Sequence, residues 1–333
     1  MPDKIRWGIL GVASIAVRRA IPAMQSGQYA EVAAIASRDL HKAEEAARTL
    51  GIPKAYGSYE ELLADRSIDA IYNPLPNHLH VPWTAKAAEA GKHVLCEKPL
   101  ALNAAEARTL LEVRDRKGVK IGEAFMVRTH PRWLRTRELV RSGRIGDLRV
   151  ISGGFSYFNR DSTNIRNSVA YGGGALLDIG CYPVTLSRFL YGEEPVRVVG
   201  SIERDPVGQT DRLTSAILEF PSGRCAFTCG TQLAYHQRMQ MMGTAGRIDV
   251  EKPFNPAIDE PTTISITVGS EPNTVPTVEA IPACNQFTIQ GDLFSRAISG
   301  DGEVPVPLED AIHNMAAIDA IFRSARSGRW EQL

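Results

Sequence analysis

The feature that most constrains the fold of this 333-residue chain is a regular alternation of short apolar runs and helix-like stretches over its first 120 residues. The apolar runs lie at 5–10, 32–36, 70–72, 93–95 and 119–122. Between them, helical patterns start at residues suited to capping, among them Ser14, Asp39, Ser58 and Asn103. Strands separated by helices pair in parallel, so this part predicts an α/β domain with a doubly wound parallel sheet.

The pattern changes after about residue 125. Helical patterns cover 132–142, 175–191, 285–298 and 308–327, and strand-like runs fill 148–158 and most of 196–281. Runs of strands followed by helices predict an α+β domain with a large open, mostly antiparallel sheet. We therefore expect two domains, 1–123 and 124–333, with the C-terminal helices able to pack back on the first.

Charge and cysteine usage narrow the class of protein. Lys and Arg number 38, as do Asp and Glu, so zero net charge offers no long-range field for nucleic acid or an anionic membrane. The chain starts without a basic, apolar leader and has no run of membrane-spanning length, which predicts a cytoplasmic protein. The five cysteines are scattered, and Cys225 and Cys229 lack a second pair, so we expect neither a disulfide framework nor a metal site.

A dinucleotide fingerprint is expected between the first strand and the first helix of such a sheet. Gly11-Val12-Ala13-Ser14-Ile15-Ala16 stands there with the right spacing, although Ala13 and Ala16 replace the second and third glycines of G-x-G-x-x-G. A simple strand-to-helix turn is the alternative. With Gly11 making the turn, a pyrophosphate would sit on the helix amides of residues 11–15.

The end of the second strand indicates which dinucleotide is bound. NAD sites carry an acidic residue there for the ribose 2′-hydroxyl, whereas this chain has Ser37-Arg38. A hydroxyl and a planar guanidinium suit a 2′-phosphate, so NADP(H) is favoured over NAD(H). A solvated surface charge is the alternative for Arg38.

Two further loops follow strands and should lie at the carboxyl edge of the sheet, where ligands bind. The first contains Pro74, Leu75, Asn77 and His80, and we expect these residues to line the cofactor. His78 and His80 are two apart and lack a nearby carboxylate, so they do not predict a metal site. The second loop is Glu97-Lys98-Pro99, whose lysine can hydrogen-bond the nicotinamide ribose or a substrate hydroxyl, with Glu97 beside the cofactor. A surface Glu-Lys pair is the alternative.

Together these motifs resemble one family. The fingerprint at 11–16, the loop 76–80, the triplet 97–99 and the segment Asp178-Ile179-Gly180-Cys181-Tyr182 occur in the order and spacing of the glucose-fructose oxidoreductase/inositol dehydrogenase (Gfo/Idh/MocA) family. The resemblance covers essentially the whole chain. Tyr182 stands where inositol dehydrogenase-like members have histidine, which resembles the branch with NADP-dependent xylose dehydrogenases, dimeric dihydrodiol dehydrogenase and keto-sugar reductases.

The resemblance implies site residues and a mechanism. Lys98 and Tyr182 would be catalytic, with Asp178 one helical turn before Tyr182 holding a substrate hydroxyl. A phenol titrates near pH ~10, so the Lys98 ammonium would stabilise the phenolate, and Tyr182 would exchange the substrate proton while the nicotinamide carries the hydride. A half-buried core tyrosine is the alternative for Tyr182.

The resemblance also places Ile165 and Arg166 near the nicotinamide and makes Arg128, Asn164 and Asn167 candidate substrate contacts, for which surface hydrogen bonding is the alternative. It implies an NADP-dependent oxidoreductase acting on a sugar or sugar-like polyol. The alternatives are an NADPH-dependent keto-sugar reductase, with a nucleotide-linked substrate included, and a non-catalytic NADP-sensing regulator. The family's open second sheet implies a homodimer or a dimer of dimers.

Overall fold

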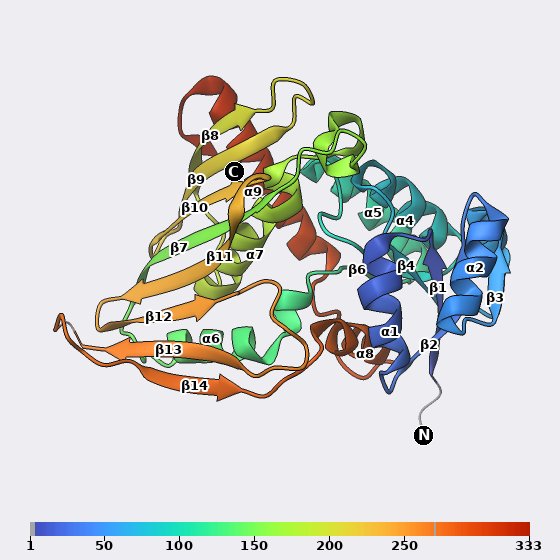
Figure 1. Ribbon diagram of the computed structural model, residues 1–333, viewed down its shortest axis with the longest axis horizontal. Coiled ribbons are helices and arrows are strands. Elements are labelled where there is room, and N and C mark those ends of the chain that lie inside the picture. Colours follow the sequence, from blue (N-terminus) through green and yellow to red (C-terminus); the bar gives the residue numbers. More distant parts are fainter. Residues whose placement is uncertain (1–3, 270) are drawn as a thin grey trace. The chain divides into compact units, whose positions relative to one another are not determined.

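A computed structural model describes residues 4–269 and 271–333 (Figure 1). By its contacts the chain divides into two units, residues up to 129 with 285–312, and residues 130–284 with 313–333. The first unit therefore runs past residue 123 and takes in a segment from near the C-terminus. The expectation of a leaderless start rests partly on residues 1–3, which lie outside the described residues.

The first unit is built on a six-stranded parallel sheet with strand order β3-β2-β1-β4-β5-β6. Its strands are β1 (Ile5–Leu10), β2 (Ala30–Ala36), β3 (Lys54–Tyr56), β4 (Ala70–Asn73), β5 (His93–Cys96) and β6 (Ile121–Glu123). This is the strand order of a dinucleotide-binding Rossmann sheet, and it confirms the predicted α/β fold. The order reverses between β1 and β4, and ligands bind such sheets beyond the carboxyl ends of those strands.

Helices connect these strands, and their starts follow the capping signals. They are α1 (Ile21–Gln25), α2 (Leu40–Leu50), α3 (Tyr59–Ala64), α4 (His80–Glu89) and α5 (Ala104–Lys117). The side chains of Asp39, Ser58 and Asn103 each accept a hydrogen bond from the backbone amide three residues further on, which confirms three predicted starts. Ser14 was expected to cap the first helix but is itself its first helical residue, and a π-helical stretch, Ala16–Ala20, precedes α1.

The C-terminal helix α8 (Gln286–Ile298) packs on this first unit. The indole Nε1 of Trp7 donates to Ser295 Oγ at 3.0 Å, and the rings of Trp7 and Phe294 lie 5.7 Å apart. The carboxylate of Asp292 accepts the backbone amides of Gln28 and Tyr29, at 3.1 and 3.0 Å. A segment almost 300 residues from β1 in sequence thus completes the core around it.

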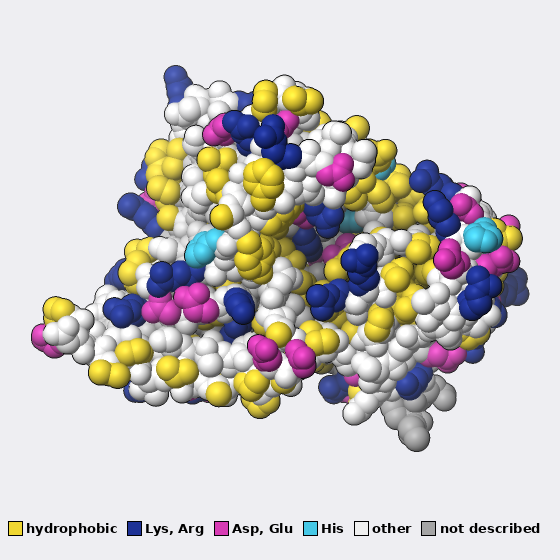
Figure 2. Space-filling view, viewed as in Figure 1, with side chains coloured by type: hydrophobic (Ala, Val, Ile, Leu, Met, Phe, Trp, Pro, Cys, Tyr) yellow, Lys and Arg dark blue, Asp and Glu magenta, His cyan; other side chains and the backbone are white. Residues whose placement is uncertain are grey.

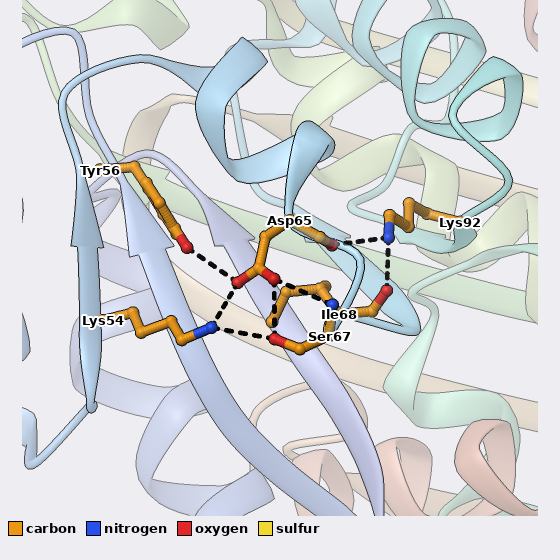
Figure 3. Close-up of polar contacts among 6 residues, drawn as sticks. All are labelled: Lys54, Tyr56, Asp65, Ser67, Ile68 and Lys92. Atoms are coloured by element: carbon orange, nitrogen blue, oxygen red, sulfur yellow. Dashed lines mark hydrogen bonds and ion pairs between the residues drawn. The ribbon is translucent and has the colours of Figure 1, made fainter.

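A polar network ties β3 to the segment before β4 (Figure 3). The Asp65 carboxylate accepts hydrogen bonds from Lys54 Nζ at 2.7 Å, the Tyr56 hydroxyl at 2.8 Å and Ser67 Oγ at 2.8 Å. The ammonium of Lys92 donates to the carbonyl of Asp65 at 2.8 Å. The bond from Lys54 holds the pKa of Asp65 well below its usual range, so the carboxylate stays ionised and paired.

The second unit is built on a nine-stranded sheet with order β14-β13-β12-β11-β7-β10-β9-β8-β15. Its strands are β7 (Leu148–Phe158), β8 (Arg197–Arg204), β9 (Asp211–Glu219), β10 (Arg224–Gly230), β11 (Gln232–Gly243), β12 (Gly246–Glu251), β13 (Thr262–Val268), β14 (Thr277–Ile281) and β15 (Glu331–Gln332). Among the described residues, neighbouring strands of this sheet pair antiparallel except β7 with β10, so the sheet is mostly antiparallel as predicted.

One face of this sheet is covered and the other is open. Along β9, buried and exposed residues alternate: Ala216 and Leu218 are buried, whereas Ser215 and Ile217 are exposed. Helix α7 (Cys181–Tyr191) packs on β7 and β10, and α6 (Pro131–Arg141) contacts β13. A π-helical stretch, Leu176–Gly180, leads into α7, and α9 (Leu308–Ser327) runs from the first unit into the second.

Charges of both signs mix on the surface. On the face drawn in Figure 2, basic and acidic side chains lie interspersed over each unit. On the second sheet, for example, Arg238 pairs with Asp249 at 2.9 Å. Positive and negative side chains therefore balance one another within each surface region, and not only in the sum over the chain. Among residues 4–269 and 271–333, no helix is both long and apolar enough to cross a membrane.

Candidate active site

The turn after β1 fits a phosphate. Gly11 has φ +83°, and a Cβ there would lie 3.0 Å from the Leu75 side chain and 3.4 Å from the Tyr59 hydroxyl. Only glycine meets both conditions without strain. The first hydrogen bond of the helix runs from Val17 N to Ala13 O, so the amides of the residues before Val17 have no acceptor within the helix and point out of its N-terminal end. Ser14 is exposed there, and Val12, Ala13 and Ile15 are half-buried.

The end of β2 presents a hydroxyl and a guanidinium. Ser37 is buried, and its Oγ accepts the amide of Asp39 at 3.2 Å, while Arg38 is exposed. Burial raises the pKa of Tyr59, and the nearby charge of Arg38 opposes that rise. The Tyr59 ring also meets Trp83 edge-on at 4.8 Å. Tyr59, which follows the Ser58 cap directly and lies near Gly11 and Arg38, is a candidate site residue that sequence reasoning did not single out.

The loop after β4 is held from within. Pro74 and Leu75 are buried, and Asn77 is half-buried. His80 is 1% exposed, with Nδ1 2.7 Å from the Pro99 carbonyl oxygen and Nε2 2.6 Å from the Leu75 carbonyl oxygen. The ring predicted to line the cofactor is therefore directed at two protein carbonyls.

The loop after β5 carries the candidate catalytic lysine. Lys98 is half-buried and precedes Pro99 through a cis peptide bond. The Glu97 carboxylate accepts the Tyr72 hydroxyl at 2.5 Å and the amide of Lys98 at 3.3 Å. Glu97 is thus occupied by the protein's own donors.

In the second unit, Tyr182 lies in an aromatic cluster. Its side chain is 4% exposed, and its ring centroid lies 5.7 Å from that of Phe155 and 5.1 Å from that of Phe254. Stacking of Phe155 on Phe254 at 4.8 Å closes the cluster. The aromatic packing fixes the ring, as an acid/base group needs.

Asp178 joins two partners near this ring. Its Oδ2 accepts the Tyr157 hydroxyl at 2.6 Å and its Oδ1 accepts Arg166 Nε at 3.2 Å. Burial and then the Asp178 charge raise the pKa of Tyr157. The pKa of Arg166 is raised by Asp178 first and, more weakly, by Tyr157 and Tyr182, so its guanidinium acts electrostatically on the Tyr182 hydroxyl. Sequence reasoning missed Tyr157.

The helix that carries Asp178 is held at its start by a second carboxylate. Asp211 is 2% exposed, and its Oδ2 accepts the amide of Leu176 at 2.6 Å and Thr214 Oγ1 at 2.9 Å. Gly174, with φ +122°, leaves the space that Asp211 fills, because a Cβ there would lie 1.9 Å from Asp211 Oδ1. This arrangement fixes the start of the π-helical stretch around Asp178.

The remaining predicted contacts have partners in the protein. Arg128, in the first unit, pairs with Asp310 at 2.8 Å through a side chain that is 11% exposed. Asn164 caps a short turn by accepting the amide of Arg166 at 3.0 Å, and Asn167 donates to the Asp161 carbonyl at 2.8 Å. Ile165 is exposed. The alternative of structural hydrogen bonding therefore describes Asn164 and Asn167 as they stand.

Each unit thus gathers its own set of predicted residues. In the first, the segments after β1, β2, β4 and β5 meet at the carboxyl edge of one parallel sheet. In the second, Asp178 and Arg166 gather near Tyr182. Among the described residues, no group of three or more His, Cys, Asp or Glu side chains has the geometry to hold a metal ion.

Comparisons with known proteins agree with this architecture. Residues 5–125 match the family model described as "Oxidoreductase family, NAD-binding Rossmann fold", and residues 133–249 match the GFO/IDH/MocA C-terminal domain. The chain is 47% identical over 332 residues to an uncharacterized oxidoreductase, ORF334, of Rhizobium meliloti, covering 99% of each chain.

Two other relatives have named activities. One is D-xylose 1-dehydrogenase (NADP(+)) 2 of Haloferax volcanii, 38% identical over 97% of this chain and 98% of that one. The other is the crystal structure of KijD10, a 3-ketoreductase from Actinomadura kijaniata in complex with NADP and TDP-benzene, which has a TM-score of 0.90 at 29% identity and covers 97% and 98% of the two chains. This chain therefore belongs to the Gfo/Idh/MocA family of oxidoreductases, as its motifs indicated.

Proposed function

We propose that this protein is an NADP-dependent oxidoreductase that transfers a hydride between the nicotinamide and a sugar or sugar-like polyol, as an aldose dehydrogenase does. The observation that carries the proposal is Tyr182, a buried phenol fixed by two aromatic rings within electrostatic reach of Arg166. A phenol needs nearby positive charge to act as a base at neutral pH. The relative named D-xylose 1-dehydrogenase (NADP(+)) supports the substrate class.

The chain's own residues would manage the proton. In the oxidative direction, Tyr182 takes the proton of the substrate hydroxyl through its phenolate oxygen while the hydride leaves the same carbon. As the family resemblance implies, Lys98 stabilises the phenolate and orients the hydroxyl, and the carboxylate of Asp178, which Tyr157 and Arg166 hold in place, binds a neighbouring hydroxyl. In reduction, Tyr182 returns the proton. The bound nicotinamide supplies the hydride chemistry.

Lys98 and Tyr182 can be tested with variants that have matched controls. Lys98→Met and Tyr182→Phe should each abolish turnover and leave NADPH binding largely intact. Lys92→Met and Tyr191→Phe are the controls, since Lys92 precedes the same strand and Tyr191, whose hydroxyl donates to the Arg224 carbonyl, lies on the same helix. Near-native rates in either test variant would refute the mechanism.

The preference for NADP rests on Arg38. Ser37 and the exposed Arg38 directly follow β2, where an NAD site would place an acidic side chain, and a guanidinium there suits a 2′-phosphate. Arg38→Ala should weaken binding of NADP(H) far more than that of NAD(H), measured by fluorescence titration. Equal losses for both cofactors would contradict a role in binding the 2′-phosphate.

A second candidate is reduction of a keto-sugar by NADPH, with nucleotide-linked sugars included. The structural neighbour described as a 3-ketoreductase, in complex with NADP and TDP-benzene, favours it. A panel of aldoses and polyols with NADP⁺, and of keto-sugars with NADPH, read at the nicotinamide absorbance, distinguishes the two reactions. Tight NADP binding without turnover on either panel would instead support a cofactor-sensing regulator.

We also propose that the protein is a cytoplasmic homodimer or dimer of dimers. The open face of the second sheet carries a shallow trough lined by Val199, Ser201, Ile217 and Ala226, with Ile217 38% exposed, and a second copy would bury it. The five cysteines lie in described segments and form no disulfide there, which is compatible with a reducing compartment. Sedimentation that shows only a monomer at micromolar concentration would refute the dimer.

A further inference from the structure

The peptide group between Pro99 and Leu100, one residue after the candidate catalytic lysine, is held at both ends. Its carbonyl, that of Pro99, faces His80 Nδ1 at 2.7 Å, and its amide, that of Leu100, donates to Glu123 Oε1 at 2.8 Å. Pro99 and Leu100 are buried, and Glu123 is 2% exposed. Two side chains from different elements, α4 and β6, therefore fix the plane of one peptide bond beside Lys98.

His80 reaches a second loop with its other nitrogen. Its Nε2 lies 2.6 Å from the Leu75 carbonyl, and Leu75 is the residue whose side chain lies over Gly11 in the phosphate turn. The backbone of His80 is itself tied down, because its carbonyl accepts Asn73 Nδ2 at 3.0 Å. One imidazole ring therefore spans the loop after β4 and the loop after β5.

The ring has the properties of a link and not of a proton donor to substrate. It is 1% exposed, and burial, aided by the Lys98 charge, lowers its pKa to about 4. In the neutral form the ring carries one proton and donates to one of the two carbonyls at a time. Both acceptors are protein carbonyls, so its proton has no path to a bound hydroxyl.

We propose that His80 is a positioning residue that sets Lys98 through the Pro99 carbonyl and sets the cofactor loop through the Leu75 carbonyl. The proposal rests on the function proposed above for Lys98. In this proposal, Nδ1 holds the loop after β5, which carries Lys98, and Nε2 holds the loop after β4, next to the turn at Gly11.

The two tasks can be separated with half-mimics of the ring. The amide nitrogen of asparagine reaches the position of Nδ1, and that of glutamine reaches the position of Nε2. In His80→Asn we expect Lys98 to keep its wild-type rate of acylation by an amine reagent, measured by mass spectrometry, while the Kd for NADPH rises about tenfold. In His80→Gln we expect the reverse, with Kd retained and the acylation rate of Lys98 and kcat changed about tenfold.

His93 provides the matched control. It lies at the start of β5, at the end of the strand opposite Lys98, and its Nδ1 accepts the amide of Lys120 at 2.9 Å. His93→Asn and His93→Gln should change thermal stability without moving either readout. If the two His80 variants shift Kd and the Lys98 rate in parallel, the proposal is overturned.

A measurement on the wild-type protein keeps the proposal testable if the variants do not fold. The ring nitrogens of His80, assigned by ¹⁵N NMR in the cofactor-free protein, should show no titration between pH 5.5 and 9 and a ring proton protected from exchange. A ring proton that exchanges with solvent as fast as that of an exposed histidine would overturn the link to the two carbonyls. Absence of turnover in the wild type would overturn the proposed function alone, because the NADPH, acylation and NMR readouts need no substrate.

Discussion

The buried carboxylate Asp211 makes the stability of the second unit depend on pH in a direction opposite to most acidic groups. Burial raises its pKa from the usual 3.8 to about 6, against the lowering effect of its bonds from Leu176 and Thr214. The folded protein therefore holds this proton more tightly than the unfolded chain. Stability falls as pH rises from about 4 to about 6 and then levels off.

The magnitude follows from the size of the shift. A rise of about 2 units in the pKa of Asp211 means that the unfolding free energy falls by about 3 kcal/mol between low pH and neutral pH. Roughly half of this loss occurs between pH 5 and 7. Asp211→Asn keeps an oxygen for the Leu176 amide and removes the titration. The unfolding free energy of the variant, relative to that of the wild type, should therefore rise by about 1.5 kcal/mol between pH 5 and 7.

Urea unfolding at pH 5, 6, 7 and 8 measures this difference. Asp205→Asn is the control, because bonds from Gln232 and from the amides of Gly208 and Val207 lower the pKa of Asp205 to about 2. Its contribution is fully present above pH 4 or so, and its difference from wild type should be flat across the range. A flat difference for Asp211→Asn as well would refute the reasoning.

Three further changes test other parts of the structure. Asp65→Asn should lower the unfolding free energy by about 1–2 kcal/mol at pH 7, a loss that urea unfolding should show shrinking as pH falls below about 4, since the pKa of Asp65 is lowered in the folded state. Gly174→Ala should cost more than about 2 kcal/mol and reduce turnover, because the new Cβ would collide with Asp211; thermal unfolding and kcat measure the two effects. Arg166→Leu should lower kcat and move the pH-rate profile to higher pH, as loss of positive charge near Tyr182 raises the pH at which a phenolate forms.

The fold could be predicted closely from the sequence wherever a helix or strand depends on residues that are neighbours along the chain. Capping residues marked the starts of α2, α3 and α5, and the apolar runs marked five of the six strands of the first sheet. The missing strand, β3, is the three-residue segment Lys-Ala-Tyr, too short and too polar to show a run. The carboxyl edge could be predicted because parallel strands all end on the same side.

The contacts around Tyr182 could not be predicted in the same way. Tyr157 and Arg166 contact Asp178 from two other segments of the chain. Which residues of these segments come into contact depends on how the segments pack, and the sequence pattern does not show that. The four-residue spacing of Asp178 and Tyr182 was interpreted as one α-helical turn. Asp178 instead lies in a π-helical stretch, which leads into the α-helix that carries Tyr182.

The contact between Trp7 and Ser295 bears on how the chain is made. Synthesis runs from the N-terminus at about 5–20 residues per second, so β1 leaves the ribosome well before α8 exists. Until α8 is synthesised, Trp7 lacks its hydrogen-bond partner Ser295 and its ring contact with Phe294, and the amides of Gln28 and Tyr29 lack the Asp292 carboxylate. The apolar surface of the Rossmann sheet that α8 covers therefore stays exposed while nearly the whole second unit is translated. We expect chaperones to bind the nascent chain mainly during that period.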